Sequence, residues 1–243
     1  MRRIFVVAVM LTGIARQAVA AQAPLTLVRD GEAQSVIVTA EKPSATVRDA
    51  ARDLQMWIEK VSGAKLPIQS ESRPVKDAAE TRILLGDTQR TRALGIDPSK
   101  FELEEIRIQT FPDALVIIGD DERPDGVALK GTLWAVETFA EQQLGVRVLW
   151  PGELGLVVPR KTTLEFGAID SRFVPVLRKR SIRNSHYSER IQTGLDRLGW
   201  SAEEFKRHYT ESEMWFRFHR IGGSFTGGYG HAYGTYWERF SKE

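Results

Sequence analysis

An alternation of short apolar runs with two amphipathic helical patterns constrains the fold of this chain more than any other feature. In the first helical pattern, apolar residues recur at spacings of three and four over residues 47–61. Ser44 can cap the start of this helix, and Gly63 can end it in the left-handed conformation. The second helical pattern covers residues 125–145. Both helices carry a tryptophan on the apolar side, and we expect Trp57 and Trp134 to be buried.

Apolar runs that are typical of strands lie before, between and after these helices. Two strands are expected around a turn at Asp30-Gly31, and the remaining strands are expected at 81–88, 104–110, 114–121, 146–150, 154–159 and 162–166. The order strand, helix, strands, helix, strand predicts an α/β fold over residues 24–170. We expect a small α/β sandwich with a mixed sheet of at least four strands and two main helices.

The pattern changes after residue 170. Residues 175–183 are typical of a new strand, and residues 201–220 are typical of a helix. A strand followed by a helix is the opening unit of a (β/α)8 barrel, which needs seven more units to close. The last residues, GGYGHAYGTYWERFSKE, lead into an amphipathic segment that the sequence does not finish. We therefore expect residues 171–243 to be the incomplete start of a TIM-barrel-like domain.

Residues 1–20 have the three parts of a secretory signal peptide. A positive start at Arg2-Arg3 precedes a short apolar run, and Ala18-Val19-Ala20 is a small-x-small cleavage site. Cleavage is expected after Ala20, with Ala23 as a second possibility, and the alternative is a buried N-terminal helix. The sequence thus predicts an exported protein, periplasmic or extracellular, that has no membrane contact after cleavage.

Charge and cysteine content exclude several classes of protein. The chain has 34 basic and 32 acidic residues, and loss of the three leader arginines leaves 31 basic residues against 32 acidic ones. The basic character therefore comes partly from the leader, and nothing indicates a nucleic-acid partner. The absence of cysteine excludes disulfides and a lipoprotein anchor.

An ordered set of segments resembles the small N-terminal domain in front of the catalytic barrel of glycoside hydrolases. The segments are AARDLQMWIEKVSGAKLPI, ILLGDT, EEIRIQTFPDALVIIGDD, GTLWAVETFAEQQLGVRVLWPGE and VVP, within residues 25–170. The resembling families are the family 20 β-hexosaminidases, the family 67 α-glucuronidases and uncharacterised bacterial relatives. The resemblance implies a non-catalytic first domain in a protein that hydrolyses O-glycosidic bonds of a polysaccharide. It also implies that the catalytic acids lie on later barrel strands.

The segment VPVLRKRSIRN supplies three candidate sugar-binding residues: Arg180, Arg183 and Asn184. In family 20 enzymes the first barrel strand presents an arginine to sugar hydroxyls, and the resemblance puts Arg180 at the matching place. Leu or Lys replaces the aromatic neighbours of that arginine here. A guanidinium can bridge vicinal hydroxyls or bind a uronate carboxylate with its fixed fork of donors. The alternative is a basic patch that packs against the first domain.

A loop rich in glycine and aromatic residues, 222–234, supplies the other two candidates, His231 and Tyr233. Flat rings can stack on the C–H faces of a sugar, and a neutral histidine can form hydrogen bonds to its hydroxyls. The alternative is a connecting loop whose aromatic side chains pack on the barrel. We expect a carbohydrate partner, either an oligosaccharide or a polysaccharide.

No residue of this chain is assigned a catalytic role. The adjacent acids at 104–105, 120–121 and 203–204 are expected to be structural, because neighbours on a strand face opposite sides and those on a helix are usually solvated. Asp125 is expected near the start of the second helix. His208 and Glu211 are three residues apart but have no third ligand, so we expect neither a metal nor a cofactor. A non-catalytic carbohydrate-binding or assembly domain is the alternative function.

Overall fold

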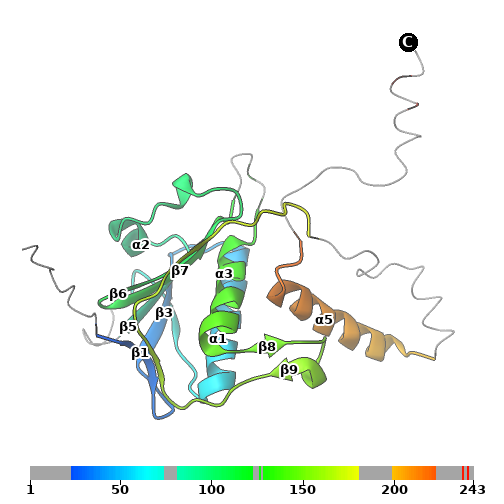
Figure 1. Ribbon diagram of the computed structural model, residues 1–243, viewed down its shortest axis with the longest axis horizontal. Helices are drawn as coiled ribbons and strands as arrows, with labels where there is room; N and C mark the ends of the chain where they lie inside the picture. The colour runs from blue at the N-terminus through cyan, green and yellow to red at the C-terminus, as the bar shows by residue number, and fades with distance from the viewer. Residues whose placement is uncertain are drawn as a thin grey trace, which may run out of the picture.

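The computed structural model describes residues 23–73, 81–122, 126, 128–180, 199–222, 237 and 240. The expected signal peptide lies outside these residues. The described chain is layered, and Figure 1 shows the layers from left to right: a short helical segment, a mixed sheet, a pair of helices and one further helix. The prediction of an α/β fold with a mixed sheet is confirmed.

The main sheet has six strands in the order β11-β6-β7-β5-β3-β4. These strands are β3 (Ser35–Thr39), β4 (Ile68–Ser70), β5 (Thr81–Leu85), β6 (Ile106–Phe111), β7 (Ala114–Gly119) and β11 (Asp170–Phe173). Strand β3 runs parallel to β4 and β5, and β5 runs parallel to β7. Strand β6 is antiparallel to both β7 and β11. The sheet thus continues to residue 173, and we call residues 25–173 the α/β unit.

Two helices cover one face of the sheet, as the sequence predicts. Helix α1 (Ala45–Ser62) begins at the Ser44 side chain, which accepts a hydrogen bond from the Val47 amide, and ends at Gly63 with φ of 83°. Helix α3 (Gly131–Phe139) continues into a π-turn, η2 (Ala140–Leu144). The predicted start at residue 125 is wrong, because Gly126 has a φ of 82° and cannot continue a right-handed helix.

The core lies on both faces of the central strands. On the helix side, Ile37, Leu85 and Ile117 pack in one cluster with Trp57 and Trp134. The exposed fractions of the two tryptophans are 0% and 4%, so the prediction that they are buried is confirmed. The opposite face is covered by residues 89–101, which include α2 (Gln89–Ala93) and η1 (Pro98–Lys100). Burial on both faces explains the apolar runs in β3, β5 and β7, at residues 36–38, 83–85 and 114–118.

Short strands complete the α/β unit beside the main sheet. Strand β1 (Leu25–Arg29) pairs with β2 (Glu32–Ala33) across the predicted Asp30-Gly31 turn, and also with β10 (Leu164–Phe166). Strands β8 (Arg147–Val148) and β9 (Leu156–Val157) form a hairpin around η3 (Glu153–Gly155). The two late strands expected from the sequence therefore exist, but each pairs with an earlier strand.

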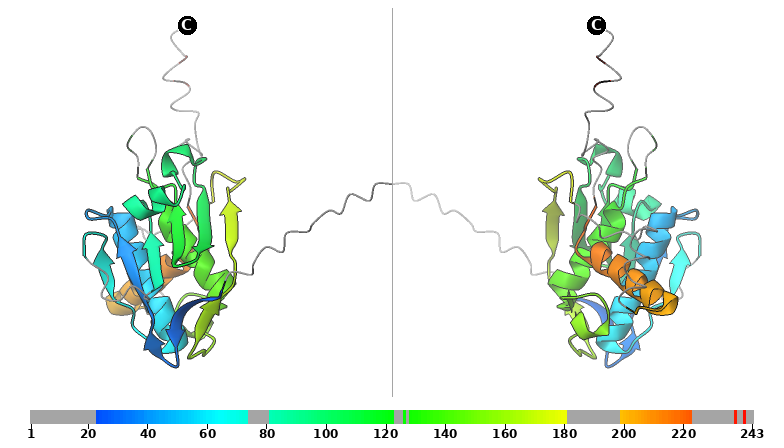
Figure 2. Two further views of the ribbon diagram at one scale, coloured as in Figure 1. Left: turned by 90° about the vertical axis from the view of Figure 1, so that its left-hand side faces the viewer. Right: turned by 90° about the vertical axis from the view of Figure 1, so that its right-hand side faces the viewer.

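Helix α5 (Ala202–Phe218) lies across α1 and α3 on the side away from the sheet, as the right-hand view of Figure 2 shows. Ser201 and Glu204 form a capping box at its start, which confirms the helix predicted there. A barrel unit is not shown: within residues 174–180, β pairing is limited to an isolated bridge between Arg180 and Gly222. In the described part of the chain, no helix is both long and apolar enough to cross a membrane.

Candidate functional site

A cavity of about 970 Å³ lies at the carboxyl edge of the parallel strands. The topology explains its position. The chain leaves β3 through α1 on one face and returns as β4, whereas it leaves β5 through α2 on the other face. The connections therefore diverge between β3 and β5. In open α/β sheets, ligands bind in the crevice that such a divergence opens outside the carboxyl ends of the strands.

Four segments line this crevice, and each follows a strand or the α2 segment. They are residues 40–47 after β3, 85–92 after β5, 98–103 after α2 and 119–122 after β7. The charged lining residues are four acids, Asp87, Asp120, Asp121 and Glu122, and two bases, Lys42 and Arg92. The apolar lining includes Phe101 and Leu103. The lining has a formal charge of −2 and both polar and apolar surface.

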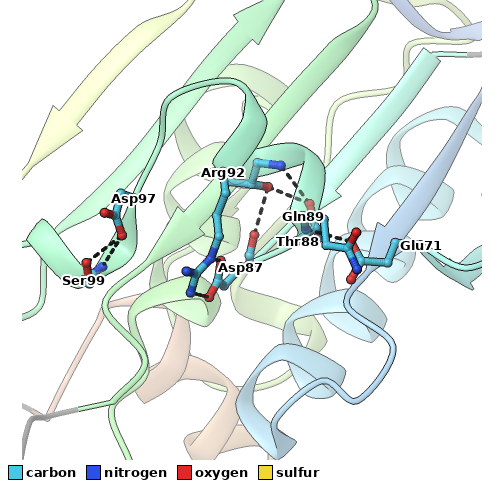
Figure 3. Close-up of polar contacts among 9 residues, drawn as sticks. Glu71, Asp87, Thr88, Gln89, Arg92, Asp97 and Ser99 are labelled. Atoms are coloured by element: carbon cyan, nitrogen blue, oxygen red, sulfur yellow. Dashed lines mark hydrogen bonds and ion pairs between the residues drawn. The ribbon is translucent and has the colours of Figure 1, made fainter.

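Figure 3 shows the wall of the crevice built by the β5–α2 connection. The Arg92 guanidinium forms an ion pair with both carboxylate oxygens of Asp87, with 2.7 Å between Nε and Oδ1. Asp97 accepts hydrogen bonds from the backbone and hydroxyl of Ser99, and these bonds lower the pKa of Asp97. This wall is held by local hydrogen bonds, and its side chains are largely exposed at the rim.

The opposite wall is the β7–α3 connection, where two neighbouring acids fix the backbone. Asp121 accepts hydrogen bonds from the Thr132 amide (2.7 Å) and hydroxyl (2.6 Å) at the start of α3. Burial raises the pKa of Asp121 to about 6, although the bonds from Thr132 act in the opposite direction. Asp120 accepts from the Glu104 amide (2.9 Å), and burial raises its pKa as well. Asp121 thus binds the backbone at the start of α3, whereas the predicted Asp125 lies outside the described residues.

Arg92, Thr132 and a backbone amide hold Asp87, Asp121 and Asp120, which are three of the four acids that line the crevice. Together with the apolar lining, these polar groups give the crevice the character of a small-molecule binding site. Within the described residues, no group of three or more metal-ligating side chains is found. An uncharged or cationic polar molecule suits the negative lining better than an anion does.

Arg180, the first sequence-predicted sugar contact, is not among the residues that line this crevice and lies at the junction after the α/β unit. Its Nη1 donates to Glu104 Oε2 (2.9 Å), and its Nε donates to the Arg220 carbonyl (2.9 Å). The guanidinium carbon lies 4.7 Å from the centre of a Trp134 ring. The side chain is 17% exposed, and that of Glu104 is 0% exposed. The alternative interpretation, packing against the first domain, describes this arrangement, and sugar binding by Arg180 stays a prediction.

The other sequence-predicted site residues, Arg183, Asn184, His231 and Tyr233, lie outside the described residues.

The adjacent acids have the structural roles expected from the sequence. Glu104 and Glu105 are both buried; Glu105 pairs with Arg172 (2.8 Å), while Glu104 pairs with Arg180. Glu204 closes the capping box of α5. His208 packs its ring edge-on to Trp200, at 5.4 Å between ring centres.

Sequence reasoning missed the crevice, although a signal was present. Both LLGDT (84–88) and IIGDD (117–121) place Gly-Asp directly after a buried apolar run. The carboxyl ends of parallel strands meet at one edge of a sheet, so these two segments had to come close once β5 and β7 were parallel. The sequence did not indicate that β5 and β7 pair in parallel, so the crevice could not be predicted from it.

Comparison with known proteins shows similarity of fold to parts of much longer enzymes. One is a family GH115 4-O-methyl-α-glucuronidase with specificity for decorated arabinogalactans, at 17% identity and a TM-score of 0.47, covering 65% of this chain and 19% of that chain. Another is a GH20 β-N-acetylhexosaminidase from Streptomyces coelicolor A3(2), at 16% identity and a TM-score of 0.38, covering 72% of this chain and 29% of that chain. A third is an inactive mutant of a GH20 exo-β-N-acetylglucosaminidase from Vibrio harveyi, at 13% identity and a TM-score of 0.37, covering 78% of this chain and 23% of that chain.

No family model and no curated protein matches the sequence. The chain spans less than a third of the length of the solved structures named above. These solved structures belong to families GH115 and GH20, whereas the sequence resemblance named families 20 and 67.

Proposed function

We propose that this chain is the N-terminal part of an exported carbohydrate-active protein, in which the α/β unit is a non-catalytic support for the segment that follows it. The full-length parent hydrolyses O-glycosidic bonds in a polysaccharide, and the catalytic carboxylates come from later parts of that protein. The ordered segments described in the sequence analysis support this proposal.

The attachment of Arg180 to the α/β unit is the observation that carries it. Arg180 follows the last strand of the main sheet, yet its guanidinium is bonded to Glu104 and stacked on Trp134 within the unit. A buried ion pair of this kind fixes the path of the chain, because separating the pair leaves an uncompensated charge on Glu104. The α/β unit thereby holds the start of whatever domain follows.

Two experiments test this proposal. The purified chain should show no turnover of a panel of nitrophenyl glycosides, since the proposal places the catalytic carboxylates in later parts of the protein. Robust hydrolysis by the purified chain would contradict the non-catalytic role. In the genome, the reading frame should continue beyond the Glu243 codon into further strand–helix units with acids at the strand ends. A stop codon directly after Glu243 would contradict the proposed parent.

A second candidate function, non-catalytic carbohydrate binding, is favoured by the crevice. Its cavity of about 970 Å³ falls in the size range of small-molecule sites and combines Phe101 with exposed hydrogen-bonding groups such as Ser99. The formal charge of −2 favours neutral or amino sugars over uronates. Titration of the labelled protein with these three classes of oligosaccharide, followed by amide NMR shifts, tests the idea.

Shifts should be confined to residues 40–44, 85–92, 98–103 and 119–122, and a Ser99→Trp variant, which fills the crevice, should lose them. A Ser212→Trp variant, on α5 and outside the crevice lining, is the control that should keep them. Shifts that persist in Ser99→Trp, or no shifts with any of the sugars, would rule out this function.

A further inference from the structure

Three charged side chains, one from each of the helices α1, α3 and α5, meet in a buried cluster. Asp53 comes from α1, Glu137 from α3 and Arg217 from α5. Arg217 Nε lies 2.9 Å from Asp53 Oδ2 and 3.9 Å from Glu137 Oε1. Trp57 Nε1 donates to Glu137 Oε2 at 2.8 Å. The Glu137 side chain is 1% exposed and that of Asp53 is 12% exposed, so neither carboxyl group is freely solvated.

The charges in this cluster do not balance if both acids are ionised. Two carboxylates would face a single guanidinium in a site from which water is largely excluded. Two of their oxygens, Asp53 Oδ2 and Glu137 Oε1, make no hydrogen bond with any described residue. Arg217 donates from Nη2 to the other oxygen of Asp53, at 3.2 Å. Both carboxyl groups lie against the same guanidinium, and one proton held by the pair of acids would balance the charge of the cluster.

We infer that Asp53 and Glu137 share one proton when α5 is docked, and that release of this proton loosens α5 from α1 and α3. With the shared proton, the three groups carry no net charge. Without it, an unpaired negative charge is buried between the helices, and such a charge is strongly unfavourable. Undocking of α5 exposes both carboxylates to water and removes the repulsion. Docking of α5 is therefore coupled to the uptake of one proton.

Burial favours the protonated form of both carboxyl groups, as the shared proton requires. It raises the pKa of Glu137 well above its usual range, and the negative charge of Asp53 raises it further. Burial also raises the pKa of Asp53, although Arg217 opposes that rise. Asp49, one turn earlier on α1, adds negative charge and itself pairs with Arg52 at 3.3 Å. Among the described residues of α5, Arg217 is the charged group paired with the two acids.

The sign of the pH effect follows from the raised pKa. The docked state binds more protons than the undocked state at pH values above the ordinary carboxyl range of about 4. Docking is then strongest below that range and weakens as the pH rises through the pKa of the docked pair. Since one proton is involved, the docking equilibrium changes by at most about tenfold per pH unit.

Fluorescence energy transfer between two labels can measure docking directly. The sequence contains no cysteine, so cysteines introduced at the exposed positions Glu59 on α1 and Lys206 on α5 are labelled without side reactions. At about pH 5 we expect a single state with high energy transfer, in which α5 is docked. As the pH is raised to about 9, a second state with low energy transfer, in which α5 is undocked, should grow. A transfer efficiency that stays constant over this range would overturn the inference.

Matched variants identify the proton. Glu137→Gln can accept from Trp57 and donate to Asp53 as the protonated acid does, so α5 should stay docked up to about pH 9. Asp53→Asn places an amide donor on Asp53 instead of on Glu137, so α5 should again stay docked as the pH rises. This variant replaces Glu137→Gln in the experiment if Glu137→Gln does not fold. Glu203→Gln, an exposed acid on α5, is the control that should keep the wild-type pH response. A wild-type response that persists in both Glu137→Gln and Asp53→Asn would equally overturn the inference.

Discussion

Trp57 and Trp134 are both buried as the sequence predicts, but their indole nitrogens have different surroundings. Trp57 Nε1 donates to Glu137, whereas Trp134 Nε1 has no hydrogen-bond partner among the described residues. Replacement by alanine should cost roughly 3–5 kcal/mol of unfolding free energy at either position, because a large buried side chain is lost.

Replacement of each tryptophan by phenylalanine separates packing from hydrogen bonding. Trp57→Phe leaves the buried Glu137 without its donor and should cost about 1–3 kcal/mol more than Trp134→Phe, which breaks no hydrogen bond. Urea unfolding of the two variants at one pH measures the difference. Equal losses would mean that the bond between Trp57 and Glu137 contributes nothing.

Arg180 and Glu104 form the ion pair on which the proposed supporting role depends. Arg180→Met keeps an aliphatic stem over Trp134 but leaves the Glu104 carboxylate buried and unpaired, so it should cost roughly 3 kcal/mol. Glu104→Gln should recover most of this loss in the double variant, because the buried group is then neutral. Denaturation of both single variants and the double variant completes the cycle. Additive effects would show that the two residues are not coupled.

Asp121 should titrate at an unusually high pH for an aspartate. Its burial at the start of α3 raises its pKa to about 6, so the stability that it contributes is greatest below the ordinary aspartate range and falls as the pH rises through about 6. Carbon-13 NMR of the Asp121 carboxyl group measures the midpoint. Asp97, whose pKa is lowered by its bonds from Ser99, serves as the control in the same spectra. A midpoint for Asp121 below that for Asp97 would refute the assignment.

At the scale of elements, β7 and α3 approach so closely that only glycine fits between them. A Cβ atom on Gly119 would lie 2.2 Å from the Gly131 backbone, and one on Gly131 would lie 2.3 Å from the Asp120 backbone. Backbone atoms cannot move aside as a side chain can, so alanine at either position should cost 1–3 kcal/mol or more. Gly167, which has open space around it, is the control, and Gly167→Ala should change stability little. Thermal unfolding of the three variants provides the comparison.

Elements with strong local signals could be predicted from the sequence, and those that depend on distant partners could not. Helix α1 was predicted together with both of its ends, because Ser44 and Gly63 act on their own helix. Strands β4 and β11 have three and four residues, and they form because a longer strand offers an edge to pair with. The start of α3 was placed too early because its cap, Asp121, lies ten residues before the helix.

The candidate sites also depend on residues that are far apart in the sequence, so they could not be predicted from it. The partner of Arg180 is Glu104, 76 residues earlier, and nothing in either local sequence indicates the other. The crevice is formed by four separate segments that meet only once the strand order is known. The residues in it could be recognised as polar ends of strands, but their convergence depends on topology.

At the scale of the whole molecule, the described chain is a layered assembly (Figure 1) in which the α/β unit holds both Arg180 and α5. A 17-residue helix such as α5 is marginally stable alone in water, so its persistence depends on the contacts that it makes with α1 and α3. Those contacts include Phe218, which is 1% exposed and packs edge-on to Trp57 at 5.7 Å between ring centres.

Hydrogen exchange of the α5 amides in the native chain, at about pH 5, measures whether the α/β unit holds this helix. Docked α5 amides should exchange about a hundredfold more slowly than in a free peptide of the same sequence, which corresponds to about 2.8 kcal/mol of docking free energy. An Arg217→Ala variant should lose much of this protection while the amides of β5 and β7 keep theirs. Exchange of the wild-type α5 amides at the rate of the free peptide, with the sheet still protected, would show that α5 is not held by α1 and α3.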